Sequence, residues 1–538
     1  MTDDRRDAQP HELAAESLRG LEKLISLATP PQHGGSRAVD DRRGGRADLL
    51  GQYGAGGAPH AGDPSLLAAR QRPRGALSEY YHIPSVELRQ HRARWAFVLA
   101  ALVAIALIAR HVVLAWFRWP DTPAAFAGIA VAAFMTSQWA LSLLYRPAVL
   151  TPDEQSRVDR LHVTVVIPCY NEDPAVLDRC LYALITQSRP PQQVCVVDDG
   201  SRIDYQVLRR HWEGHWPQGI EVTWARQANQ GKKRAQVAGF TSSPDADIFV
   251  TIDSDTALER RAIEEGIKPF ADRGVSSVAG IEVAFNAQVN WLTQAMNSRG
   301  VFYQLVLCQV QGMLGDMYVN RGAFSLYRAG LIRRIIPAYV GETFLGYPVR
   351  LGDDSALTLF ARGSGRTVQQ STAFGLSMFP ETFSHHARQR VRWGRGAAIR
   401  NLWRIRYLPV FSYVWWFTFI RIHVSTLPLA VPLVVVFSSP EPTRVVEQGF
   451  LIAVVWTLLS GLRTMSVRRS DENLVHRLMT ALVRPTANAW ALLVIIPIRF
   501  YGTVTFFRQG WTTRNKGAEP MAAVEEAAKP GARQVAAA

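Results

Sequence analysis

The stretch Ile248-Phe249-Val250-Thr251-Ile252-Asp253-Ser254-Asp255-Thr256 decides the fold and points to the chemistry. Its first five residues are apolar or β-branched and predict a buried strand. Two carboxylates, Asp253 and Asp255, follow where that strand ends. Oxygen ligands of this kind suit one divalent cation such as Mg²⁺ or Mn²⁺. An Asp-x-Asp pair is common by chance, so its meaning depends on the rest of the chain.

The region from about 160 to 400 alternates strand-like and helix-like patterns. Such alternation predicts a doubly wound, mostly parallel α/β sheet, whose ligands bind at the carboxyl ends of the strands. The predicted elements are, in order, a strand at 162–168, a helix at 176–187, strands at 193–197 and 222–224, a helix at 234–240, a strand at 248–252 and a helix at 356–362.

Two further polar motifs follow predicted strands. Pro168-Cys169-Tyr170-Asn171-Glu172 comes after the first strand, and Asp198-Asp199-Gly200-Ser201 comes after the second. The paired carboxylates suit hydrogen bonds to a nucleobase or ribose, but an Asp-Gly pair is also an ordinary turn. Because these motifs and Asp253-Ser254-Asp255 all fall at strand ends, we expect them to share one edge of the sheet.

Charged motifs also mark two predicted helix starts. Asn229-Gln230-Gly231-Lys232-Lys233-Arg234 places bases after a glycine, which suits a phosphate; a solvated basic turn has the same composition. Gly352-Asp353-Asp354 precedes the helix at 356–362. Paired acids there could supply a general base, and they could equally cap the helix.

The run Gln389-Arg390-Val391-Arg392-Trp393 is the most specific of the motifs. Arginine pairs with phosphate oxygens, and tryptophan offers a flat apolar platform for a sugar ring. The alternative is a basic amphipathic helix on a membrane surface, which the further arginines of this region also fit.

The ends of the chain differ from its middle. The 538 residues carry a net charge of +15 and suffice for one large domain with additional segments. Apolar runs at 95–117 and 124–145 are long enough to cross a bilayer, and flanking arginines place both outer ends in the cytoplasm. The basic excess therefore indicates a membrane surface rather than nucleic-acid binding.

The chain becomes apolar again after about residue 400. We expect an interfacial helix leading into a span near 424–437, a span at 449–465, a basic internal loop at 466–486 and a segment at 488–507. That last segment either crosses fully or turns back at Pro497. Three polar residues in these segments are candidates for channel lining or headgroup contact: Arg421, His423 and Arg499.

Four cysteines without Cys-x-x-Cys spacing predict a reduced compartment, with no disulfide framework and no zinc site. The terminal regions are rich in Gly, Pro, Ala and Arg, which is typical of disorder, apart from a weak amphipathic pattern at 11–28. The expected parts are a disordered tail at 1–88, a transmembrane hairpin at 89–148, a cytoplasmic domain at 149–403, interfacial and transmembrane helices at 404–509, a short motif at 510–517 and a disordered tail at 518–538.

Together these ordered motifs resemble the processive inverting family-2 glycosyltransferases, which are the membrane synthases of hyaluronan, chitin and cellulose. The resemblance covers about 90–517. It is greatest to hyaluronan synthases in Asp253-Ser254-Asp255-Thr256, in Gly352-Asp353-Asp354 and in Gly510-Trp511-Thr512-Thr513-Arg514. It implies a cytoplasmic glycosyltransferase-A-type domain inserted between N-terminal and C-terminal transmembrane helices, at the plasma membrane.

The resemblance also implies a role for each motif. Asp253 and Asp255 would hold Mg²⁺ or Mn²⁺ on the diphosphate of UDP, and Asp354, beside Asp353, would deprotonate the acceptor hydroxyl. The other implied residues bind the donor or the acceptor: Tyr170, Glu172, Asp198 and Asp199 at the uridine, Lys232 and Arg392 at the phosphates, Gln389 and Arg390 as further substrate-binding residues, Trp393 at the acceptor entrance, and Trp511 and Arg514 in a loop that closes over UDP.

The implied partners are a UDP-sugar donor, a growing polysaccharide acceptor and the lipid bilayer. UDP-GlcNAc is the first choice of donor, and added UDP-GlcA would give hyaluronan. A membrane enzyme that adds a single sugar, a synthase of a chitin-like homopolymer and a non-catalytic scaffold remain the alternatives. The sequence gives no oligomeric state.

Three departures from the family pattern concern the acceptor. Asn320-Arg321-Gly322 stands where hyaluronan synthases usually have Ser-Gly-Pro, Ser355 replaces the usual arginine after Gly-Asp-Asp, and Trp511-Thr512-Thr513-Arg514 lacks a glycine. The run 323–328 is similar to an acceptor-side loop of the family.

Overall fold

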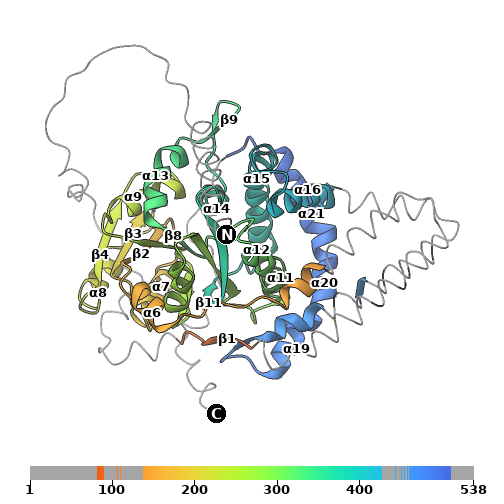
Figure 1. Cartoon of the computed structure of the whole chain (residues 1–538), viewed down its shortest axis with the longest axis horizontal. Coiled ribbons are helices and arrows are strands. Elements are labelled where there is room, and N and C mark those ends of the chain that lie inside the picture. Colours follow the sequence, from red (N-terminus) through yellow and green to blue (C-terminus); the bar gives the residue numbers. More distant parts are fainter. Residues whose placement is uncertain are drawn as a thin grey trace, which may run out of the picture.

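The computed structural model describes residues 82–89, 137–426 and 460–509, with isolated positions at 106, 110 and between 443 and 457. Within these ranges a sheet domain stands beside a group of long helices (Figure 1). Several predicted segments lie wholly or mainly outside the described residues: the helix at 11–28, the spans at 95–117, 124–136, 424–437 and most of 449–465, and the motif at 510–517.

A mixed eight-stranded sheet forms the centre of the domain. Its strands are β2 (Val163–Cys169), β3 (Gln193–Asp198), β4 (Glu221–Arg226), β5 (Ile248–Ile252), β6 (Thr256–Leu258), β7 (Val275–Ala284), β8 (Phe324–Arg328) and β11 (Arg366–Ser377). Their order in space is β4-β3-β2-β5-β8-β7-β11-β6. The first four strands pair in parallel, and β7 also pairs in parallel with β11. In contrast, β8 runs antiparallel to β5 and β7, and β6 runs antiparallel to β11.

The predicted parallel strands are therefore present, but the other half of the sheet is mixed. The run 323–328, compared above with an acceptor-side loop, is mostly strand β8 in the middle of the sheet. Phe324 and Leu326 are fully buried there, between β5 and β7. A strand that pairs on both edges has no free backbone to form a loop at the acceptor.

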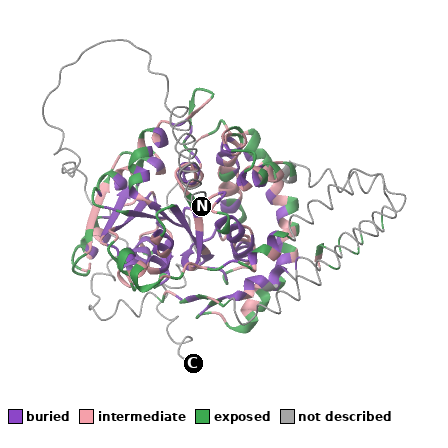
Figure 2. Ribbon diagram, in the orientation of Figure 1, coloured by how far each residue is buried: buried purple, intermediate pink, exposed green. Residues whose placement is uncertain are grey.

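Helices cover both faces of the sheet (Figure 2). On β2, Val163, Val165 and Ile167 point to one face and Val166 to the other, as strand geometry requires. The first face packs against α6 (Pro152–Asp159), α7 (Pro174–Ile185), α8 (Gln206–Glu213), α10 (Ala262–Ile267) and the adjoining 3-10 turn η1 (Lys268–Ala271). The second packs against α9 (Lys232–Thr241), α13 (Ala329–Val340) and α14 (Asp353–Arg362).

A group of helices stands at the β11 side of the sheet (Figure 1). Its members are α11 (Trp291–Tyr303), the π-helical turn η2 (Gln304–Cys308), α12 (Gln309–Met313), α15 (Phe383–Tyr407), α16 (Tyr413–Thr426), the 3-10 turn η3 (Leu462–Ser466), α19 (Leu474–Leu482), α20 (Arg484–Trp490), the π-helical turn η4 (Ala491–Ile495) and α21 (Ile496–Val504). Two small antiparallel pairs complete the fold: β1 (Val86–Leu88) with β12 (Val467–Arg469), and β9 (Thr343–Phe344) with β10 (Tyr347–Pro348).

The segment from α19 to α21 forms one helix of 31 residues, Leu474–Val504. In the part of the chain that the structure describes, it is the one helix long and apolar enough to cross a membrane, a criterion that some soluble core helices also meet. The expected loop at 466–486 is therefore wrong beyond residue 473. Of the two alternatives for the last segment, a turn back at Pro497 is not found, because the wide turn η4 precedes the proline and the helix continues.

Both ends of this helix are attached to the sheet domain. Just before it begins, Arg469 donates to the carbonyls of Ala284 and Phe285 at the end of β7. Just after it ends, the side-chain oxygen of Gln509 accepts from the amides of Arg350 and Leu351, each at 3.2 Å. A helix of this length spans about 46 Å, so it lies along the side of the domain.

Two glycines bring α15 and α21 into close contact. A β-carbon placed on Gly502 would lie 2.7 Å from the carbonyl oxygen of Val391 and 3.1 Å from the α-carbon of Gly394. The two backbones therefore meet at a point where no side chain fits.

Substituting Gly502 by alanine should separate α15 from α21. We expect a loss of about 1–3 kcal/mol, because the added methyl overpacks the crossing, and a lower melting temperature in detergent. Gly330→Ala on α13 is the matched control, since its β-carbon would meet nothing within 4 Å and should be neutral or slightly stabilising. Equal melting of both variants would contradict the tight crossing.

Candidate active site

An acidic centre forms where β5, α9 and α14 meet. The ammonium Nζ of Lys232, the first residue of α9, lies 2.7 Å from Oδ1 of Asp253 and 2.8 Å from Oδ2 of Asp353. Oδ1 of Asp354 is 3.7 Å away from the same nitrogen. Three of the predicted site acids thus surround a fourth predicted site residue, Lys232, although these residues are up to 122 positions apart in the sequence.

Two glycines give these residues their positions. Gly231 (φ +90°) precedes α9 and Gly352 (φ +77°) precedes α14, and residues with a side chain rarely adopt such angles. The N-cap position of α14 is Gly352, which has no side chain. The capping role considered for Asp353 and Asp354 is therefore not found. Asp353 and Asp354 instead occupy the first turn, where the helix dipole favours negative charge.

The charged groups of this centre shift one another's pKa values. Burial opposes the charge on Lys232, but Asp253, Asp353 and Asp354 outweigh it and raise the lysine's pKa well above its usual value. Burial also opposes ionisation of Asp353, yet neighbouring Lys232 lowers its pKa overall. For Asp354, burial and then the Asp353 carboxylate raise the pKa well above its ordinary range. One acid is thereby held ionised while its neighbour has a greater affinity for a proton.

The run Asn320–Gly322, which departs from the family pattern, lies directly against the second of these acids. A β-carbon on Gly322 would be 2.4 Å from Oδ1 of Asp354. Only glycine leaves room for the carboxylate in this arrangement. Sequence reasoning missed this neighbour, because the two residues are brought together by β8 and α14.

Asp199 organises the loop that carries Lys232, and Asp198 organises the turn after β3. Oδ1 of Asp199 accepts from the amide of Gln230 at 2.9 Å, and Oδ2 accepts from the amide of Gly231 at 2.8 Å. Burial is the main reason why the pKa of Asp199 is raised. Oδ1 of Asp198 accepts from the amide of Ser201 at 2.9 Å. Both carboxylates thus hold the turns at this edge of the sheet.

Glu172 connects the end of β2 to the metal-type motif after β5. Its Oε2 accepts a hydrogen bond of 2.7 Å from the hydroxyl of Ser254. The hydroxyl of Tyr205 accepts from the Glu172 amide at 2.6 Å and donates to the Glu172 carbonyl at 2.8 Å. Tyr170 is half-buried beside them. Sequence reasoning missed Tyr205, which lies outside every motif.

The oxygen donors of Asp253 and Asp255 have the chemistry that Mg²⁺ or Mn²⁺ favours. Asp253 already binds a cation, the Lys232 ammonium, at 2.7 Å. Within the described ranges, no cluster of three or more His, Cys, Asp or Glu side chains is arranged to hold a metal ion. Two carboxylates suffice for a Mg²⁺-type ion that takes its remaining ligands from water and substrate phosphates.

The Gln389–Trp393 run lies near the start of α15. The Arg390 guanidinium lies over the Trp393 ring at 4.8 Å, and Trp393 is 46% exposed. Gln389 and Arg392 are half-buried. The same helix reaches the acidic centre one turn later, because Gly396 packs against Gly352. Trp511 and Arg514 lie outside the described residues, but Gln509 fixes the start of their segment beside Leu351.

A buried ionic triad supports the other side of the centre and was not expected from the sequence. Arg400 on α15 donates to both oxygens of Glu342, at 2.6 and 2.5 Å. Lys233 also contacts Glu342, and it donates to the carbonyl of Val349 at 2.8 Å. The triad joins α15 to the start of α9, immediately beside Lys232.

Removing the charge of Lys232 should destabilise the metal-free protein. Lys232→Met leaves Asp353 without its cation in a buried site, and we expect a loss of roughly 2–3 kcal/mol; partly solvated Asp253 adds little. Melting temperature without metal or nucleotide measures the loss. Added Mn²⁺ should recover part of it in this variant, because the carboxylates then bind a replacement cation.

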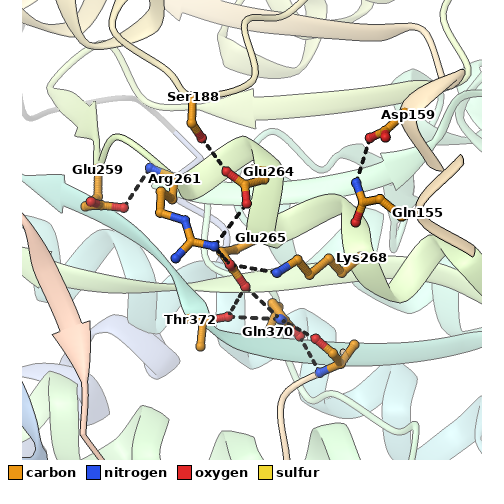
Figure 3. A network of polar contacts seen from close by, with 11 residues as sticks. Gln155, Asp159, Ser188, Glu259, Arg261, Glu264, Glu265, Lys268, Gln370 and Thr372 are labelled. Carbon is orange, nitrogen blue, oxygen red and sulfur yellow. Dashed lines mark hydrogen bonds and ion pairs between the residues drawn. The ribbon is translucent and has the colours of Figure 1, made fainter. Parts of the chain in front are cut away.

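Lys268→Met is the matched control. Lys268 pairs with Glu265 at 2.7 Å on the opposite face of the sheet, with an exposure similar to that of Lys232, and lies in the network of Figure 3. The Lys268→Met variant should have a lower melting temperature, and Mn²⁺ should not restore it. Equal behaviour of the two variants would show that Asp253 and Asp353 do not form a cation site.

Known proteins resemble this chain along most of its length. A family model described as glycosyltransferase-like family 2 matches residues 160–396. The hyaluronan synthase of Streptococcus pyogenes serotype M3 is 28% identical over 421 residues, covering 78% of this chain and 97% of that protein. An N-acetylglucosaminyltransferase of Rhizobium meliloti is 25% identical over 414 residues, covering 74% and 93%.

Among solved structures, a mannosyltransferase from Pyrobaculum calidifontis in complex with GDP-Man and Mn²⁺ covers 73% of this chain and 99% of its own, with a TM-score of 0.41 and 18% identity. The family match itself spans β2 to α15 and contains every described residue of the acidic centre. Residues 160–396 are therefore a glycosyltransferase family 2 domain, and the chain is a glycosyltransferase.

Proposed function

We propose that this chain is a processive, inverting membrane glycosyltransferase that polymerises sugars from UDP-sugars and exports the polysaccharide. The donors are UDP-GlcNAc and, for a polymer of the hyaluronan type, UDP-GlcA. The observation that carries the proposal is the acidic centre around Lys232, with the Trp393 helix packed against it through Gly396. The similarity to a hyaluronan synthase over 97% of that protein supports the choice of product class.

Donor binding uses the loops at the strand ends. Uridine would lie beside Tyr170, Glu172, Asp198 and Asp199. Lys232, placed by the loop that Asp199 holds and paired with Asp253, would approach the phosphates. Asp253 and Asp255 would hold Mg²⁺ or Mn²⁺, which when bound offsets negative charge on the diphosphate. Further positive charge would come from α15 through Arg392.

In the transfer step, Asp354 is the general base. Its carboxylate takes the proton of the acceptor hydroxyl as that oxygen bonds to the anomeric carbon of the donor sugar. The bond from this carbon to the diphosphate oxygen breaks on the opposite side, so the configuration inverts and UDP leaves. A raised pKa makes Asp354 a better base, and its neighbour Asp353 is a source of that shift.

The acceptor would occupy the side of the centre that faces the long helices. Trp393 would stack on the sugar at the acceptor end, and Trp511 with Arg514 would close over UDP. Beyond them, Arg421 lies over the Tyr318 ring at 4.9 Å and, with Arg499, is a candidate for the polymer path.

The helix Leu474–Val504 is proposed to lie along the membrane face rather than to cross. Both its ends are attached to the sheet domain, which supports an arrangement in which the chain stays on one side of the membrane. An apolar side of the helix would rest in the headgroup region, with these exposed residues: Leu474, Val475, Leu478, Met479, Leu482, Leu493, Phe500, Tyr501 and Val504.

Asp354→Asn should abolish transfer without preventing donor binding. We expect the rate of UDP release to fall by about 10²–10⁴-fold, because the amide cannot accept the proton. Calorimetric UDP affinity and melting temperature should change little. Asp272→Asn, in an exposed pair with Arg366 far from the centre, should keep full activity. Unchanged polymer yield from Asp354→Asn would overturn the assignment of the base.

Donor choice is tested on the purified protein in vesicles with Mn²⁺ or Mg²⁺. We expect high-mass product only when UDP-GlcNAc and UDP-GlcA are both present, measured by UDP release and by product size. Product from UDP-GlcNAc alone would indicate a chitin-type homopolymer. UDP release without long product would indicate transfer of a single sugar, and no release would contradict the enzyme assignment.

A further inference from the structure

A buried histidine on α15 has no role in the chemistry described so far. His386 is fully buried, and neither of its ring nitrogens has a hydrogen-bond partner among the described residues. Nearby on the same helix, Oε1 of Gln389 and Nε of Arg390 are also buried without a partner. Leaving a buried polar atom unpaired costs about 1–3 kcal/mol, so three such groups together point to a ligand that satisfies them.

These groups share one face of α15. Residues 386, 389, 390 and 393 are spaced by three, four and seven positions, which aligns them along a helix. About 10 Å, or two helical turns, separate His386 from Trp393. The acidic centre meets α15 on the far side of Trp393, at Gly396. His386 therefore lies farther from the transfer site than the tryptophan does.

Neighbouring helices complete this polar region. Arg299 on α11 donates to the side-chain oxygen of Asn488 on α20. Arg299 also interacts electrostatically with both His386 and Arg390. Three helices, α11, α15 and α20, thus place hydrogen-bonding groups around one spot between the sheet domain and the helix Leu474–Val504.

Burial and these positive neighbours lower the pKa of His386 to about 3. A neutral imidazole presents one donor and one acceptor. A sugar hydroxyl has the same pair of functions, whereas a phosphate offers acceptors. The charge state therefore favours a hydroxyl-rich ligand at the ring.

We propose that His386, with Gln389, Arg390 and Arg299, forms a second sugar subsite that holds the elongated chain two helical turns beyond Trp393. The inference rests on the proposed polymerase function and deepens it. The subsite binds hydroxyl groups of the polymer after they have left the transfer site. Its effect is to slow dissociation of the growing chain between additions, so it controls product length rather than the chemistry of one transfer.

His386→Phe tests the subsite, because it keeps a flat ring and removes both nitrogens. Wild type and variant are compared in vesicles with UDP-GlcNAc and UDP-GlcA. We expect a product shorter by about two- to tenfold, since one lost hydrogen bond changes a dissociation constant by that factor. The KM for each donor should stay unchanged. The melting temperature should be equal or higher, because an unpaired polar group has been removed from the interior.

His211→Phe on α8 is the matched control, since it makes the same chemical change at the opposite end of the molecule (Figure 1), and should leave length unchanged. If His386→Phe does not fold, His386→Leu replaces it with the same expected shortening. Wild-type length in a folded His386 variant would overturn the subsite. A wild-type enzyme that makes no polymer with any donor would instead overturn the proposed function on which it rests.

Discussion

The arrangement of the site depends on one ammonium group shared among carboxylates. Lys232 contacts Asp253 from β5 and Asp353 from α14, so it fixes the distance between the two predicted catalytic motifs. Its own position is set from both sides. Asp199 holds the loop before it through two backbone amides, and the triad of Lys233, Glu342 and Arg400 holds the residue after it. Loss of either support would move the charge on which both acids depend.

Local patterns predicted the parallel half of the sheet, because its strands are continuous runs of Val, Ile and Cys. The other half was missed where polar residues are buried in strands. Gln370 and Ser371 of β11 are fully buried and bond to Glu265 and Gln309. Contacts between distant residues, such as Gly322 against Asp354, leave no local pattern in one sequence. The motifs predicted which residues meet at the acidic centre, but not the triad that supports them.

The positions of arginines did not predict the helix and loop boundaries of the C-terminal segments correctly, and the reason is physical. The sequence pattern predicts that Arg484 lies in an internal loop, yet its side chain is buried in a helix. Its guanidinium lies 3.8 Å over the Phe302 ring and donates to the carbonyl of Ser298 at 3.1 Å. An arginine with an aromatic face and a carbonyl to bind belongs to an interface between helices. The positive-inside rule assumes that such a charge faces water.

Helix α15 links the acidic centre to the long helix Leu474–Val504, because it packs against each of them through a glycine. Gly394 meets Gly502 of α21, and Gly396 meets Gly352 before the two acids. With the two contacts only two residues apart, a displacement of α21 reaches Gly352 through a single turn of helix. Close-packed backbones transmit such a displacement rather than absorb it. The position of Asp354, the proposed base, is thus tied to the helix that lies along the side of the domain.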